Sequence, residues 1–203
     1  MNLAFLSPSI DIENSILDEI SKWTTEVLSK PSPHFNGLPA CPYAQQAWLD
    51  SKVAVLFKYE KNNQTLYNTI SLFDDNFDIA IIVDLSNQMP SDVFHQYLDD
   101  LNTVISNGMF IDRDLWVMGF HPDDEPSDFV QDVSFNPVID IEYSMIFVQR
   151  LSKLQEAADK LDKKGYYDTY DDEYNAKEIY ARRETLYRRL KDGNASKEKT
   201  NCS

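Results

Sequence analysis

The stretch "DIAIIVDL", residues 78–85, places five consecutive apolar residues between two aspartates. A run this short and this continuous is typical of a β-strand that is covered on both faces. Such a strand needs one layer of structure above it and another below it. The run therefore favours a layered α/β fold, in which helices flank a small sheet.

The segments around this run alternate between strand and helix patterns. Residues 52–59, "KVAVLFKY", predict a strand, and residues 64–73 predict a short helix. Residues 90–108 have helical spacing, and residues 114–120, "DLWVMGF", predict a third strand that ends at His121. This β-α-β-α-β order predicts an α/β sandwich with three core strands, in which a functional site is expected at the carboxyl ends of the strands.

The N-terminal region predicts a helix, a proline-rich loop and a second, short helix. Apolar spacing indicates the first helix over residues 12–28, with Asp11 as its N-cap. After the loop, Pro42 is expected at the first position of a helix that runs through Trp48, with Cys41 at the N-cap.

The C-terminal region predicts helices and then a polar tail. Residues 142–164 are expected to be helical and to complete an α/β domain over residues 1–164. A tyrosine-rich helix follows over residues 165–191, and it is expected to dock either onto the domain or onto a second subunit of a homo-oligomer. Residues 192–203 are polar and predict a disordered tail.

Composition narrows the range of partners. The net charge is −15, from 19 basic and 34 acidic residues, so nucleic acid is not an expected partner. No apolar run is long enough to cross a bilayer, and the N-terminus lacks a basic start, so we expect a soluble, cytoplasmic protein without a membrane partner. Cys41 and Cys202 lie far apart, and both are expected to be reduced.

Three short motifs occur in a characteristic order along the chain. The first is "GLPACPYA", residues 37–44, and the second is Phe-His-Pro at residues 120–122. The third is "EYSMIFVQRL", which contains Tyr143, Met145 and Arg150. Together they resemble the motifs of a bacterial family of unknown function, domain-of-unknown-function family 1415, in which Tyr143, Met145 and Arg150 occupy matching places. This resemblance implies where a site lies and does not imply a reaction.

A second, local resemblance concerns the "HPDDE" stretch that follows the third strand. It is similar to the zinc motif of the LmbE-like deacetylases. The resemblance implies that His121 and Asp124 hold a divalent metal and that Asp123 acts as the base, within a metal site of His121, Asp123 and Asp124. A third protein ligand would come from one of three residues: Asp128, Glu142 or His34.

The leading hypothesis is a small enzyme of unknown substrate whose catalytic residues are Cys41 and His121. A helix N-terminus stabilises a thiolate, and a histidine at a strand end can serve as base or acid. Tyr43, Tyr143 and Arg150 are the expected binding residues for a small-molecule ligand. The alternative is that Cys41 is a small buried apolar residue and that His121 only bonds to the loop backbone.

Two further alternatives stay open from the sequence. One is a metal-dependent hydrolase that uses His121, Asp123 and Asp124. The other is an acidic, non-catalytic binding or adaptor protein that uses its tyrosine-rich helix. His95, on the predicted helix over residues 90–108, is expected to lie on the surface.

Overall fold

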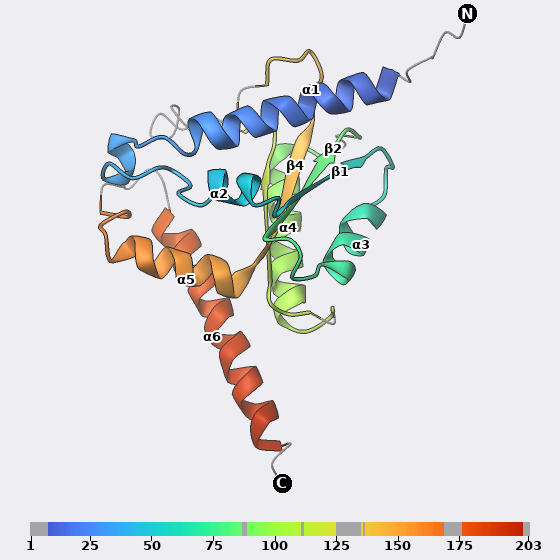
Figure 1. Ribbon diagram of the computed structural model, residues 1–203. Coiled ribbons are helices and arrows are strands. Elements are labelled where there is room, and N and C mark those ends of the chain that lie inside the picture. The colour runs from blue at the N-terminus through green and yellow to red at the C-terminus, as the bar shows by residue number, and fades with distance from the viewer. Residues whose placement is uncertain are drawn as a thin grey trace, which may run out of the picture.

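The chain forms a four-stranded mixed sheet flanked by helices on both faces, with a long C-terminal helix that extends away from the sheet (Figure 1). This is a computed structural model, and it confirms the predicted α/β class. The residues that it describes are 8–86, 89–110, 112–124, 135, 137–168 and 176–200.

The sheet has the order β1-β2-β4-β3. Its strands are β1 (Val53–Lys58), β2 (Ile79–Asp84), β3 (Leu115–Phe120) and β4 (Ser144–Arg150). β1 and β2 are parallel, whereas β4 runs antiparallel to both of its neighbours, β2 and β3. The three predicted strands are confirmed, and their carboxyl ends meet at one edge of the sheet.

β4 corrects the sequence prediction, because residues 144–150 were expected to be helical. Met145 and Phe147 pack on one face of the sheet, and Ile146 and Val148 pack on the other. A strand buried on both faces has no polar alternation, and periodicity alone does not distinguish it from a buried helix. The helical prediction holds only from α5 (Leu151–Asp162) onward.

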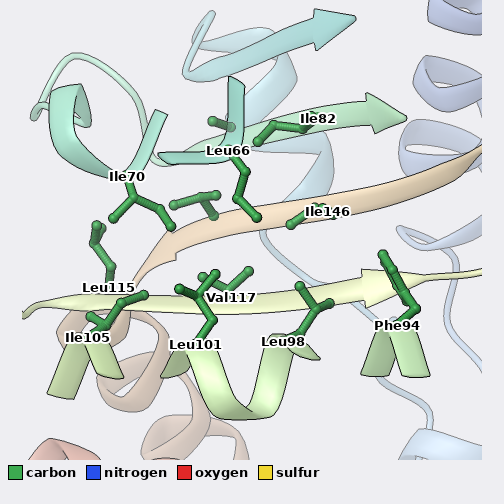
Figure 2. Close-up of a cluster of buried hydrophobic side chains, with 12 residues drawn as sticks. Leu66, Ile70, Ile82, Phe94, Leu98, Leu101, Ile105, Leu115, Val117 and Ile146 are labelled. Carbon is green, nitrogen blue, oxygen red and sulfur yellow. The ribbon is translucent and has the colours of Figure 1, made fainter. Parts of the chain in front are cut away.

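One face of the sheet is covered by α3 (Gln64–Leu72) and α4 (Ser91–Ser106). Figure 2 shows their apolar side chains converging on those of β2, β3 and β4. The close approach of α4 depends on Gly119, because a Cβ at that position would lie 2.4 Å from the Phe94 ring. Both helices begin at the edge of the sheet where β1, β2 and β3 end.

The opposite face is covered by α1 (Pro8–Lys22), which continues as a π-helical turn (Trp23–Val27), and by α2 (Ala44–Leu49). Two predicted caps are wrong. α1 begins at Pro8, so Asp11 lies within its first turn. α2 begins only at Ala44 with Tyr43 as its N-cap, because Cys41 and Pro42 form a turn before it.

α6 (Ala176–Thr200) packs against α5 and extends beyond it (Figure 1). The apolar contact joins Trp116 and Leu151 to Leu186 and Tyr187. The tyrosine-rich segment is thus docked on its own domain. α6 also continues through Thr200, where a disordered tail was predicted, and residues 201–203 lie outside the described part.

None of the helices in the described part is both long enough and apolar enough to span a membrane.

Candidate functional site

A small pocket lies at the edge of the sheet where β1, β2 and β3 end and β4 begins. Its cavity volume is about 20 Å³, which is room for a water-sized chemical group. Its walls come from the strand ends and from the beginnings of α3 and α4. The lining residues are Lys58, Lys61, Asn63, Asp84, Ser86, Met89, Phe94, Tyr97, His121, Ser144 and Ile146.

Three of these residues form a polar row across the last rung of the sheet. The strand register places Lys58 beside Asp84, and Asp84 beside Ser144. Because side chains alternate along a strand, the polar row points to the same face as Ile82 and Ile146, under α3 and α4. The polar row therefore borders the apolar core where β1 and β2 end and β4 begins, and it forms the floor of the pocket.

Lys58 is the charged centre of the polar row. It is only 2% exposed, and its Nζ donates to Asp84 Oδ2 at 2.8 Å, to Ser86 Oγ at 2.9 Å and to the Glu60 carbonyl at 2.8 Å. An ammonium group has three N–H donors, so all of them are used. Lys58 thus neutralises Asp84 and fixes Ser86, and it has no donor left for a ligand.

Ser144 is the member of the polar row without a partner. It is 2% exposed and lines the pocket, yet within the described part of the chain its hydroxyl makes no hydrogen bond. The buried side-chain atoms that lack a partner in the described part are Arg150 Nε, Gln155 Oε1 and Arg183 Nε, and Ser144 Oγ is not one of them. Solvent therefore reaches this hydroxyl, and a ligand in the pocket could take the place of that water.

His121 forms a buried wall of the pocket. It is 1% exposed, and its ring lies 5.5 Å from the Phe94 ring. Nε2 is 2.9 Å from the Met89 carbonyl, and Nδ1 is 3.1 Å from the Asp123 backbone N–H. These partners assign the proton to Nε2 and commit both ring nitrogens, which leaves no free nitrogen for a base or a metal ligand.

Asp124 ties the His121 loop to α4. Its Oδ1 accepts from Ser91 Oγ at 2.6 Å and lies 2.8 Å from His95 Nε2, while its Oδ2 accepts from the His121 N–H at 2.8 Å. Burial would raise the pKa of Asp124, but the hydrogen bonds from Ser91, His121 and His95 outweigh it, so the pKa lies below its usual value. His95 is partly exposed, as expected, and the sequence contains no signal for its link to Asp124.

The residues present do not fit the metal site that the deacetylase resemblance implies. Both nitrogens of His121 and both oxygens of Asp124 already have partners, and Asp123 is 74% exposed on its side chain. Among the described residues, no group of three or more His, Cys, Asp or Glu side chains could hold a metal. Asp128 lies outside the described residues.

Cys41 and His121 are not brought together. The backbone N–H of Cys41 donates to the Leu28 carbonyl at 2.9 Å, in the layer of α1 and α2, whereas His121 packs against α4 on the other face of the sheet. Burial raises the pKa of the Cys41 thiol, and the backbone N–H groups of Tyr43 and Ala44 lower it by less. The predicted activation of the Cys41 thiol by the N-terminus of α2 is therefore outweighed by burial, which leaves the pKa raised.

The three predicted binding residues are also dispersed. Tyr43 is exposed in the turn before α2. Tyr143 is buried under α1, where its hydroxyl donates to Glu19 Oε2 at 3.1 Å. Arg150 lies at the far end of β4, at the edge of the sheet opposite the pocket. An extended strand of this length separates its ends by about 20 Å, so Tyr143 and Arg150 cannot share a small ligand.

Comparisons of the chain with models of protein families, with curated proteins and with solved structures found no match. Both resemblances seen in the sequence therefore remain predictions.

Proposed function

We propose that the chain is a small-molecule-binding protein and that its ligand enters the pocket at the ends of β1, β2 and β3. The observation that carries this proposal is Ser144, a residue of the pocket lining that is 2% exposed and whose hydroxyl makes no hydrogen bond within the described part of the chain. A ligand that accepts or donates one hydrogen bond there would replace the water that otherwise solvates this hydroxyl. Ligand sites commonly combine apolar walls with a few polar groups.

Binding without covalent chemistry fits the groups around the pocket better than the enzyme expected from Cys41 and His121. His121 has no free ring nitrogen, and Cys41 lies in another layer with a raised pKa. The adaptor alternative also has less support, because Tyr166 stacks on Phe35 and Tyr187 is buried, so these tyrosines pack within their own chain.

A second candidate function is an enzyme that uses Ser86. Its Oγ lies 2.5 Å from Asp84 Oδ1, and Lys58 contacts both groups. A hydroxyl beside a carboxylate that is oriented by a third group is the arrangement of nucleophile, base and orienting residue. The same contacts also form a local turn, because the Ser86 N–H donates to Asp84 Oδ1 at 2.9 Å. Ligand binding is therefore the better supported of the two.

The test is a fragment titration of the ¹⁵N-labelled full chain, followed by amide chemical shifts. The expected result is that several small polar fragments shift the amides of Ser86 and Ser144 in a saturable manner. Ser144→Val, which removes the hydroxyl and fills the space, should abolish these shifts, and Ser106→Val, on the exposed side of α4, should not. If no fragment shifts the pocket amides, the proposal is wrong.

A further inference from the structure

We infer that the ligand of this pocket carries an oxyanion, either a carboxylate or a phosphate, which binds between Lys61 and Ser144. This inference rests on the proposed function, since it names the class of ligand for the same site.

Most polar groups of the lining already have partners. Lys58 and Ser86 are bonded to Asp84. The Tyr97 hydroxyl donates to Tyr67 at 3.1 Å and is also bonded to the Asn63 side chain. In contrast, the Ser144 hydroxyl and the Lys61 ammonium group form no hydrogen bond or ion pair within the described residues. Both of these groups can donate, and Lys61 is a cation, so the ligand that uses them should be an acceptor with negative charge.

Lys61 is the cation of the lining that has no partner among the described residues. The chain as a whole carries −15, but the lining contains two lysines and one aspartate. Lys58 and Asp84 offset each other at 2.8 Å. Glu60 is not part of the lining, and its carboxylate accepts from the Thr65 N–H at 3.0 Å in the first turn of α3.

α4 begins at this edge of the sheet, so the positive end of its dipole lies beside the lining residues Met89 and Phe94. A helix N-terminus favours an anion. The N-terminus of α3 contributes less, because it already holds the Glu60 carboxylate. α4 reinforces Lys61 and does not define the site alone, because Ser144 is the lining residue whose hydroxyl lacks a partner within the described residues.

The volume of the cavity limits which part of the ligand can enter it. A cavity of about 20 Å³ admits one oxygen-bearing end of a molecule. The oxyanion should therefore accept from Ser144 at the floor, while the rest of the ligand stays at the mouth beside Lys61 and Tyr97. Lys61 is exposed and can move to meet it.

The experiment titrates the ¹⁵N-labelled full chain with acetate, inorganic phosphate and neutral acetamide. Acetate or phosphate should shift the amides of Ser86 and Ser144 in a saturable manner, whereas acetamide should bind at least about threefold more weakly. Lys61→Gln and Ser144→Ala should each weaken anion binding by about threefold to tenfold. Lys30→Gln makes the same substitution at an exposed lysine outside the lining and should change nothing.

The outcomes separate the two proposals. Tighter binding of phosphate than of acetate identifies a phosphate ligand, and the reverse order identifies a carboxylate. If acetamide binds as well as acetate, or if Lys61→Gln has no effect, the oxyanion inference is wrong and the binding site stands. The same holds if only neutral fragments reach the pocket. If no small molecule of either kind reaches it, both proposals fail.

Discussion

At each of the two ends of the sheet, along the strand direction, the last residue of one strand is a buried cation. Lys58 ends β1, and Arg150 ends β4. Because β4 is antiparallel to its neighbours, the two cations lie at opposite edges. Lys58 is 2% exposed and Arg150 is 9% exposed, and each is paired with aspartate. By burial and charge alone, the two ends look alike.

Their surroundings differ. At the Arg150 end, the guanidinium group contacts Asp112, Asp75 and the Phe73 carbonyl, and its carbon lies 5.0 Å from the centre of the Phe73 ring. Its Nε has no hydrogen bond within the described residues, but the aromatic face covers the group. At the Lys58 end, the Ser144 hydroxyl makes no hydrogen bond within the described residues, but it is not one of their buried atoms without a partner, and its residue lines a cavity. A buried cation is therefore weak evidence of a ligand site, and an available polar group in the lining of a cavity is stronger evidence.

The largest expected effect is that of Lys58→Met. It should lower the free energy of unfolding by about 3 to 5 kcal/mol, because it leaves Asp84 without its charged partner. Urea unfolding measures this change. Adding Asp84→Leu to Lys58→Met should restore most of the loss, since an apolar pair replaces a buried ion pair at little cost. A loss below about 1 kcal/mol would show that the pair is solvated and would remove the distinction between the two ends.

Arg150→Met should cost less, about 2 kcal/mol. Asp75 is almost fully exposed and Asp112 is partly exposed, so water can solvate both when the cation is removed. The same unfolding experiment tests this, and fragment shifts at Ser86 and Ser144 should be unchanged. A cost equal to that of Lys58→Met would contradict the difference in burial.

Asp124→Asn probes the contacts that hold the His121 loop against α4. At about pH 7 it should lower stability by about 1 to 2 kcal/mol, the usual value for hydrogen bonds to a charged group. Because the pKa of Asp124 is lowered in the folded state, its contribution is present above the unfolded-state value of about 4 and is lost as the pH falls through the folded-state value.

Unfolding measured from about pH 7 down to about pH 3 should therefore show wild type and Asp124→Asn converging in acid. Parallel curves would mean that Asp124 does not provide this pH dependence. Asp123→Asn is the matched control, because that side chain is largely exposed.

Ser144→Ala should have only a small effect on stability. Because the Ser144 hydroxyl makes no hydrogen bond within the described residues and is not a buried unsatisfied atom, removing it should change the free energy of unfolding of the free protein by less than about 0.5 kcal/mol. Ser106→Ala removes a hydroxyl that donates to the Thr103 carbonyl at 2.8 Å and should not stabilise the protein. A destabilised Ser144→Ala protein would show that the hydroxyl is already satisfied.

The smallest expected effect concerns Cys41, and it tests whether reactive chemistry occurs outside the pocket. In a Cys202→Ser background, thiol labelling should be slow near neutral pH and should rise only above the usual pKa of about 8.5, because burial raises the pKa of Cys41. His121→Ala should leave this profile unchanged. A thiol pKa below the usual value that rises in His121→Ala would restore the cysteine–histidine hypothesis.

Much of the fold could be predicted from local patterns. The apolar run at residues 78–85 and the periodic pattern after it correspond to β2 and α4, because the first pattern fits a strand well and the second fits a helix well. The pattern of residues 144–150 fits both a strand and a helix. "SMIFVQR" lies on both faces of the sheet and runs directly into α5, so no turn residue separates the strand from the helix.

The site was harder to predict than the fold for the same reason. Lys58 and Asp84 were visible in the sequence as charged residues at the ends of apolar runs, which is a signal of a strand end facing a site. Ser144 was hidden, because it lay inside a predicted helix. The motif residues, such as Cys41 and His121, have reactive side chains, but burial and sheet register decide which side chains meet, and no short motif contains that information.

The position of β4 has a consequence for how the chain acquires its structure during synthesis. β4 is the last strand in the sequence, yet it lies between β2 and β3 in the sheet. Until residues 144–150 have left the ribosome, β3 cannot join the β1-β2 pair. The edges of β2 and β3 with which β4 pairs remain open until then. Sheet completion is therefore a late, long-range event, and a nascent chain that stops short of β4 exposes apolar strand edges that invite aggregation.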